Sequence, residues 1–392
     1  MPALQPERPA APLAHDAHEV RAAWIEATRL RTLPLAASGS LVAAGIAIAR
    51  GAWRPEVFAL MLAVSLLLQV IANFADDYGD LSHGLDDETR VGPRRGMQRG
   101  IITPAQMKRA LIALCALTFA LGCALIAVAF SGGPALGTDA MLAAGIFVAL
   151  GIAAIAAAVL YTVGPHPYGY LGLGDIMSFV FFGLVAVIAG TFLYTHAWDV
   201  APLVAGVALG LPVAAVMNIN NMRDSLADAA KGKHTIANRL YAAGAHAGER
   251  WVRGRTPGEI SGMVAVLERG PHVDLAAFDA EVTAEGQAAI DRARSPQTVA
   301  ALTGESYMRA YHLALIYASL ALFVVATFLV RGVELATFAR AAAVLAASYP
   351  LMRATQGACH QLDHEKLDRF MAPTSLGTVL LAAVFAIVVA LG

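Results

Sequence analysis

The sequence predicts an all-α polytopic membrane protein with nine transmembrane helices. Hydrophobic residues make up 58% of the 392 residues and charged residues only 15%, against roughly 25% charged residues in a typical soluble domain. The apolar residues fall in blocks of about twenty, the length that crosses a hydrocarbon core of about 30 Å. The net charge of −1 gives no overall field that would attract nucleic acid. The three cysteines include no CxxC pair, so neither a disulfide framework nor a zinc site is expected.

Basic residues set the predicted orientation. The predicted outer loops contain Arg50, Arg54 and Arg331, whereas nearly all other Lys and Arg residues fall on the opposite side of the membrane. Because basic loops stay in the cytosol, we expect a cytosolic N-terminus, an outside C-terminus and a multi-pass protein of the cell inner membrane. The nine predicted spans are 33–49, 56–76, 108–130, 140–162, 172–194, 200–220, 310–330, 334–352 and 375–391.

The chain divides into a membrane domain and one long cytosolic insertion. Residues 1–23 are rich in Ala and Pro and lack an apolar segment, which predicts a disordered cytosolic tail. Residues 24–240 contain spans one to six, and residues 304–392 contain spans seven to nine. Between them, 241–303 is not membrane-like and is expected to be helical, with a helix start at Thr256 and Pro257. This insertion could be a lid, a docking surface for a protein partner, or inert.

Two acid-rich motifs leave the membrane on the same predicted side. In the first, positions 73, 76, 77 and 80 would share one face of a helix that continues span two. In the second, positions 221, 224 and 228 would share a face of span six. Ordinary solvated acids at helix ends are the alternative, but carboxylates there oppose the helix dipole, and acids at membrane depth are costly and usually functional. The candidate metal ligands are Asp76, Asp77, Asp80, Asp86, Asn221, Asp224 and Asp228.

Oxygen ligands of this kind suit Mg²⁺, which shares its coordination shell with water and phosphate. Two facing clusters could hold Mg²⁺ ions on one diphosphate, and nearby cations would neutralise the remaining charge. A diphosphate that carries a long hydrocarbon would require an intramembrane site. These features together describe a polyprenyl diphosphate.

The same residues resemble the UbiA superfamily of intramembrane prenyltransferases, and within it the 1,4-dihydroxy-2-naphthoate branch of menaquinone biosynthesis. The resemblance covers about 24–240 and 305–392 and rests on the runs 29–34, 77–80, 92–98, 161–175 and 218–224. It implies a nine-helix bundle that uses Mg²⁺ to transfer a prenyl chain to the naphthoate, with loss of CO₂ and diphosphate, giving demethylmenaquinone. The chain departs from the family in two places: Asp76 stands where the family usually has Asn, and 241–303 replaces a short link.

The resemblance also implies roles for individual residues. The catalytic candidates are Asp77, Asp80, Asp175, Asp224 and Asp228. Asp175 could orient the aromatic hydroxyls of the acceptor, or it could be a helix N-cap. Tyr161 and Tyr168 could pack on the acceptor ring, or they could belong to an interfacial tyrosine belt. The substrate-binding candidates are Arg29, Asn73, Arg95, Gln98, Tyr161, Tyr168, Asn221, Arg223 and Lys233.

Two alternative functions remain open at this point. The acceptor could be 4-hydroxybenzoate or another phenol, although the runs at 92–98 and 161–175 favour naphthoate. A secondary transporter could also use intramembrane acids and half-repeats, but its acids would be expected near mid-bilayer, whereas these lie at helix exits.

Overall fold

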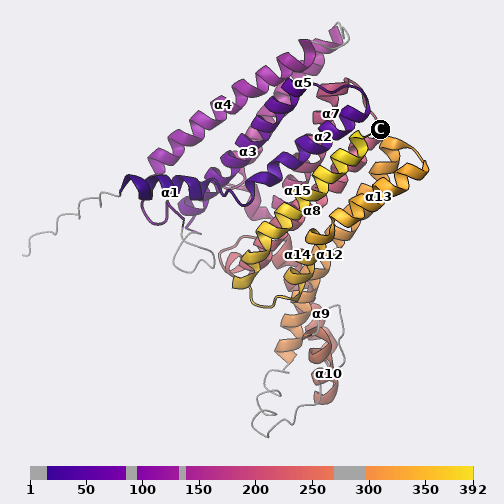
Figure 1. Ribbon diagram of the computed structural model, residues 1–392. Coiled ribbons are helices and arrows are strands. Elements are labelled where there is room, and N and C mark those ends of the chain that lie inside the picture. The colour runs from indigo at the N-terminus through magenta and orange to yellow at the C-terminus, as the bar shows by residue number, and fades with distance from the viewer. Residues whose placement is uncertain (1–15, 85–94, 132–137, 269–295, 392) are drawn as a thin grey trace, which may run out of the picture.

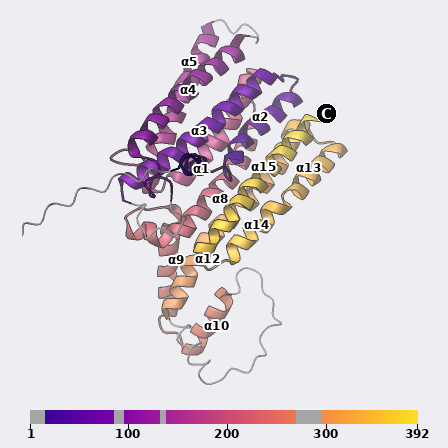
Figure 2. The same ribbon diagram turned by 60° about the vertical axis from the view of Figure 1, so that its left-hand side comes forward.

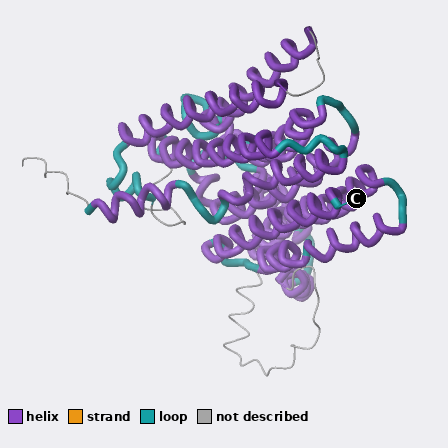
Figure 3. The backbone as a smooth tube through the Cα atoms, turned by 45° about the horizontal axis from the view of Figure 1, so that its top comes forward, coloured by secondary structure: helices purple, strands orange, loops and turns teal. Residues whose placement is uncertain are grey.

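The computed structural model describes residues 16–84, 95–131, 138–268 and 296–391. Within these ranges every regular element is a helix (Figure 3). Eight helical segments are long and apolar enough to cross a membrane, and a shorter apolar segment covers Leu33–Ala49. The predicted all-α membrane architecture is therefore confirmed. The first predicted span corresponds to the shorter segment, so the count of nine remains a prediction.

The first helices of the chain form one side of the bundle. The predicted tail boundary at residue 23 is wrong, because α1 already begins at Ala17, with Asp16 as its N-cap. Ala23 and Ala27 of α1 are buried against Ile71, Phe74 and their neighbours, which explains why this amphipathic segment is ordered. The elements are α1 (Ala17–Ala27), η1 (Leu33–Ala36), α2 (Ala37–Ala49), α3 (Pro55–Ser82), α4 (Pro104–Ser131) and α5 (Thr138–Leu160).

The fifth predicted span is one continuous helical segment with an unusual centre. It consists of α6 (Gly174–Ser178), the π-helical η3 (Phe179–Ala189) and α7 (Gly190–Thr195). π-Helical turns are rare and often occur at functional sites. At Gly183 this segment lies so close to α8 that a Cβ atom would meet the backbone of Gly206 and Gly210. The span thus packs tightly against α8 on one side while its other side stays available to line a site.

Helix α8 (Val200–Ala230) is the centre of the bundle and the most buried of the spanning helices. It packs against η3, α12 (Pro296–Arg331) and α15 (Asp368–Ala390). Figure 2 shows α8, α12 and α15 running alongside one another, with α2 next to α15. The main core lies here and includes Ile46, Leu209, Phe323 and Phe385. The most central helix therefore carries the second acidic motif at its end.

The eighth span is interrupted by a proline. It consists of α13 (Leu335–Ala347) and α14 (Tyr349–His360), and Pro350 stands in the first turn of α14. A proline has no backbone donor and breaks a continuous helix, so the break follows from the sequence. The short η4 (Glu365–Leu367) then leads into α15.

Two helices project from the end of the bundle where α8 finishes (Figure 1). These are α9 (Ile236–Val252), which packs along α12, and α10 (Pro257–Glu268). The start of α10 is the predicted one: Thr256 N and Oγ1 donate to Glu259, and Glu259 N donates back to Thr256 Oγ1. The described part of the insertion is thus helical, and residues 269–295 of it lie outside the described residues.

Candidate active site

A cavity of about 360 Å³ lies between α3, α4, α5, the α6–α7 span and α8. One end is charged, with Asp76, Asp80, Arg95 and Asp228 among its walls. The rest is mostly apolar, apart from side chains such as Ser65, Gln69 and Thr118, and extends along α3 as far as Met61. Nineteen helical positions separate Met61 from Asp80, which corresponds to about 28 Å at 1.5 Å per residue. The cavity is therefore long, with one polar end.

The first acidic motif occupies the last turns of α3. Asn73, Asp76 and Asp80 line the cavity, whereas Asp77 is only 2% exposed and does not. The Thr162 hydroxyl donates to Ala75 O at 2.8 Å, which fixes this end of α3 against the loop after α5. Positions 73, 76, 77 and 80 thus share one helix face as expected. Asp77 lies at the edge of this face and is buried. Asp86, a predicted metal ligand, lies outside the described residues.

Arg29 bridges α1 to this motif. Its Nη2 lies 2.5 Å from Asp76 Oδ2 and 2.7 Å from Asp77 Oδ1. The backbone of Arg29 has φ = 52°, a left-handed conformation that is uncommon for a residue with a side chain and clusters at functional sites. Although burial and the nearby Arg95 lower the pKa of Arg29, the charges of Asp76 and Asp77 outweigh them and raise it. Arg29 is therefore a permanent positive charge at the mouth of the cavity.

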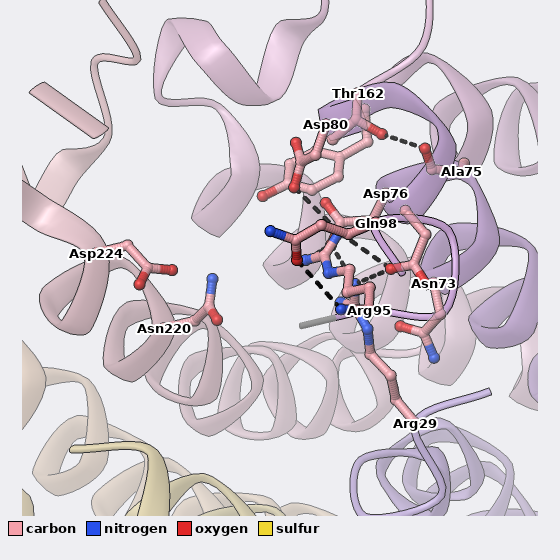
Figure 4. A network of polar contacts seen from close by, with 12 residues as sticks. Arg29, Asn73, Ala75, Asp76, Asp80, Arg95, Gln98, Thr162, Asn220 and Asp224 are labelled. Carbon is pink, nitrogen blue, oxygen red and sulfur yellow. Dashed lines mark hydrogen bonds and ion pairs between the residues drawn. The ribbon is translucent and has the colours of Figure 1, made fainter. Parts of the chain in front are cut away.

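Arg95 binds all three carboxylates of the first motif. Its guanidinium nitrogens lie 2.9 Å from Asp76, 3.0 Å from Asp77 and 3.2 Å from Asp80. Gln98 does not line the cavity; its Oε1 accepts from Arg95 N at 3.3 Å, so it stabilises the loop that carries Arg95. Figure 4 shows this network facing Asn220 and Asp224 across the cavity.

The second motif lines the opposite wall from α8. Asn220, Asp224 and Asp228 reach the cavity because they are spaced by four residues and share a helix face. Lys233, in the turn after α8, lies 3.2 Å from Asp228 Oδ2. Burial lowers the pKa of Lys233, but Tyr161, Asp228, Asp80 and Asp76 together raise it above its ordinary value, so it stays charged.

Two sequence predictions for this wall are wrong in the structure. Asn221 faces away from the cavity, and its Nδ2 donates to Asp175 Oδ1 at 2.8 Å. Asp175 is 2% exposed and also accepts from the Tyr311 hydroxyl at 3.3 Å. Asp175 thus does not line the cavity, and it is not the N-cap of α6, because Leu173 occupies that position. It holds α8 and α12 together.

Arg223 is also not at the cavity surface. Its Nε and Nη2 bind the two oxygens of Asp224 at 2.8 and 2.6 Å, and its Nη1 binds Asp368 of α15 at 2.7 Å. Bidentate pairs of this kind fix a carboxylate in orientation as well as in charge. Arg223 therefore positions Asp224 rather than contacting a substrate.

Three tyrosines close the space between the two motifs. Tyr161 and Tyr168 line the cavity with their rings 5.5 Å apart, and the Tyr168 hydroxyl donates to Ala157 O. Burial raises the pKa of Tyr168 to about 12, so it remains a neutral donor. Tyr170 of η2 (Tyr168–Leu171) donates to Asp80 Oδ1 at 3.2 Å, and Lys233 lies over its ring. Tyr170 thereby joins the first motif to the lysine of the second.

The donor set suits Mg²⁺ that is shared with phosphate. Within the described ranges, no three His, Cys, Asp or Glu side chains converge on a single metal position. Instead, the cavity presents carboxylate or amide oxygens from α3 and from α8, with cations beside them. Mg²⁺ commonly takes one or two carboxylates and fills its shell with water and phosphate oxygens, so the residues fit a metal–diphosphate complex.

The structure thus brings most of the predicted site residues together and excludes some. Asp77, Gln98, Asp175, Asn221 and Arg223 lie behind the cavity surface. The sequence reasoning missed Asn220, Tyr170 and Asp368, although the spacing of 220, 224 and 228 was a signal for Asn220. The predicted residues that line the cavity are Arg29, Asn73, Asp76, Asp80, Arg95, Tyr161, Tyr168, Asp224, Asp228 and Lys233.

Comparison with known proteins agrees with this geometry. The sequence profile of the UbiA prenyltransferase family matches residues 38–253, which contain both motifs. The chain belongs to the UbiA prenyltransferase family. It is a membrane-embedded prenyltransferase, and the cavity between α3 and α8 is its candidate active site.

Several relatives of the chain carry the same name, 1,4-dihydroxy-2-naphthoate octaprenyltransferase. The protein of Escherichia coli (strain K12) is 44% identical over 224 residues, which cover 56% of this chain and 68% of the relative. That of Haemophilus influenzae (strain ATCC 51907 / DSM 11121 / KW20 / Rd) is 42% identical, covering 56% and 69%. That of Mycobacterium tuberculosis (strain ATCC 25618 / H37Rv) is 36% identical, covering 56% and 70%.

Proposed function

We propose that this enzyme transfers a polyprenyl group from polyprenyl diphosphate to 1,4-dihydroxy-2-naphthoate, with loss of CO₂ and diphosphate, giving demethylmenaquinone. The observation that carries the proposal is the cavity with one charged end and a long apolar remainder. A polyprenyl diphosphate has the same division between an anionic head and a hydrocarbon chain. The names of the relatives at 42–44% identity support the naphthoate as the acceptor.

The charged end would hold the diphosphate. Asp80, Asp224 and Asp228 offer oxygen ligands for Mg²⁺, and Asn220 and Asp76 can add to them. Bound Mg²⁺ would supply Lewis-acid assistance to departure of the diphosphate. Arg29, Arg95 and Lys233 also line the cavity and would neutralise the phosphate oxygens.

The acceptor would lie between the diphosphate and the apolar walls. Tyr161 and Tyr168 line this part of the cavity with their rings 5.5 Å apart, and aromatic rings prefer to pack against one another. The apolar surroundings would keep water away from the allylic carbon while the electron-rich ring attacks it. The hydroxyl of Tyr161 faces Met217 Sδ and could turn to a hydroxyl of the acceptor.

The membrane position follows from the distribution of basic residues. The charged end of the cavity is formed by the last turns of α3 and α8, and Figure 1 shows α1 and α9 at this end of the bundle. Because basic segments remain cytosolic, we place this end in the cytoplasm, with the N-terminus on that side and the C-terminus outside. The enzyme would then take both substrates from the cytoplasmic face of the inner membrane.

Two alternatives make different predictions. A 4-hydroxybenzoate prenyltransferase would use the same donor with a one-ring acceptor. A transporter would move an ion or solute without forming a carbon–carbon bond. The amphiphilic cavity and the names of the relatives favour the naphthoate reaction.

A transfer assay separates these possibilities. Membranes that contain the enzyme would receive radiolabelled polyprenyl diphosphate with either aromatic acid, with and without EDTA. We expect a lipid-soluble product with the naphthoate only, loss of it with EDTA, and recovery on addition of Mg²⁺. Asp224→Asn should abolish the product, whereas Asp363→Asn, at a surface aspartate paired with Lys366, should not. Absence of product with either acid, or turnover that EDTA does not affect, would overturn the proposal.

A further inference from the structure

The carboxylates that a metal would need are already occupied by side-chain cations. Asp76 Oδ2 receives both Arg29 at 2.5 Å and Arg95 at 2.9 Å. Asp80 receives Arg95 and the Tyr170 hydroxyl. On the opposite wall, Lys233 lies against Asp228. A metal ion that entered the cavity alone would therefore have to replace existing ion pairs.

These cations belong to the cavity and not to the protein surface. The side chains of Arg95 and Lys233 are only 12% and 8% exposed, and both line the cavity together with Arg29. Displacement of Arg95 from its carboxylates would leave a poorly hydrated positive charge close to a divalent cation. Ionic groups that lose their partner in such surroundings are strongly disfavoured. Binding of Mg²⁺ without an anion is thus opposed both by competition from the arginines for the carboxylates and by repulsion between the metal and the displaced arginines.

A diphosphate that binds with the metal removes both the competition and the repulsion. Its oxygens can accept Arg29 and Arg95 while the carboxylates turn to the metal. Every charged group then still has a partner of opposite charge. The arginines pair with phosphate oxygens in place of the carboxylates, and the carboxylates bind the metal in place of the arginines. Asp77, which the two arginines share at 2.7 and 3.0 Å, lies beneath them and is reached only when they move.

We infer that Arg95, together with Arg29, holds the place of the divalent cation in the ligand-free enzyme and moves to the diphosphate when the metal binds. Metal and diphosphate therefore bind jointly, each increasing the affinity for the other, as linkage requires. The inference rests on the proposed function, since it assumes that a metal–diphosphate complex occupies this end of the cavity. One functional consequence is that the carboxylates do not retain metal ions between turnovers.

The test compares two equilibria in the purified full chain in detergent. Binding of Mn²⁺ alone is followed by electron paramagnetic resonance, and binding of inorganic pyrophosphate is followed by calorimetry at saturating Mg²⁺. For Arg95→Gln we expect Mn²⁺ alone to bind about tenfold more tightly than to the wild type and pyrophosphate about tenfold more weakly, within the usual range of coupling between sites. These opposite shifts distinguish competition from general damage to the site.

Two further variants control the experiment. Arg99→Gln removes an arginine of the same loop that pairs with Glu26 at the surface, and it should change neither affinity. Arg95→Lys keeps the charge but cannot bridge three carboxylates, so its Mn²⁺ affinity should lie between those of the wild type and Arg95→Gln. Mn²⁺ affinity that is unchanged or weaker in a folded Arg95→Gln protein would overturn the inference. If the wild type formed no prenylated naphthoate while Arg95→Gln still tightened Mn²⁺, only the proposed function would fail.

Discussion

The buried amide of Asn221 donates to Asp175 Oδ1 at 2.8 Å, and this bond fixes which face of α8 reaches the cavity. Because Asn221 points away from the cavity, Asn220, Asp224 and Asp228 point into it. The second acidic motif is thus oriented by a carboxylate outside the cavity. Catalytic geometry depends on such supporting residues as much as on the groups that contact the substrate.

Substitution of Asp175 should damage the protein without removing a group from the cavity. Asp175→Ala leaves the buried Asn221 amide without its acceptor, at about 1–3 kcal/mol, and also removes the acceptor of the partly buried Tyr311 hydroxyl. We expect a lower melting temperature in detergent and a lower kcat. Ile176→Ala, at an exposed neighbouring position, is the matched control and should change neither. An Asp175→Ala protein with wild-type stability would show that the bond does not hold α8.

Neighbouring asparagines of α8 should give opposite phenotypes. Asn220→Ala removes a side chain from the cavity wall and one acceptor of Arg223, which donates to Asn220 Oδ1 at 2.8 Å. Because Arg223 keeps its ion pairs with Asp224 and Asp368, activity should fall while the melting temperature falls less than in Asn221→Ala. Asn221→Ala removes a buried bond to Asp175, so the melting temperature should fall as well. Initial rates and thermal unfolding of the two purified variants test this difference. The reverse pattern would mean that α8 is rotated by one residue from the orientation described.

The close contact between the π-helical segment and α8 should be intolerant of one added methyl group. A Cβ at Gly183 would overlap the backbone of Gly210, and overpacking of this kind costs about 1–3 kcal/mol. Gly183→Ala should therefore lower the melting temperature and the activity together. Gly145→Ala adds the same methyl group to α5 where nothing lies within 4 Å, and it should be neutral or stabilising. Equal melting temperatures for the two variants would contradict the packing described.

The ion pair between His364 and Glu305 predicts a pH dependence of stability. His364 Nε2 lies 2.7 Å from Glu305 Oε1; this bond raises the pKa of His364 above 6.5, although burial and Arg309 oppose the increase. Because the folded-state pKa is the higher one, the stabilisation is fully present below about pH 6.5 and is lost as the pH rises through the folded-state pKa. The melting-temperature difference between wild type and His364→Gln should thus be larger at pH 6 than at pH 9. A difference independent of pH would show that His364 is not protonated in the fold.

The sequence allowed most of the helices to be predicted, because apolar runs of membrane length leave few alternatives. Even the start of α10 was predictable, since the capping box at Thr256 and Glu259 is a local signal. The rotation of a helix about its axis is harder to predict, because spacings of three and of four both place residues on one face. Positions 221, 224 and 228 and positions 220, 224 and 228 therefore fit the sequence equally well, and the structure has Asn220 at the cavity. The contacts that decide the rotation, from Asp175 and from Asp368 through Arg223, join residues 46 and 145 positions apart. No local pattern reports them.

We propose that α3 and α8 together hold one metal–diphosphate complex. The most direct measurement is a structure of the enzyme with Mn²⁺ and a non-reactive prenyl thiodiphosphate, with the metal located by anomalous scattering. We expect Mn²⁺ between Asp80 on α3 and Asp224 and Asp228 on α8, with the diphosphate against Arg29 and Arg95 and the prenyl chain directed towards Met61. Mn²⁺ bound away from both helices, or a diphosphate outside this cavity, would contradict it.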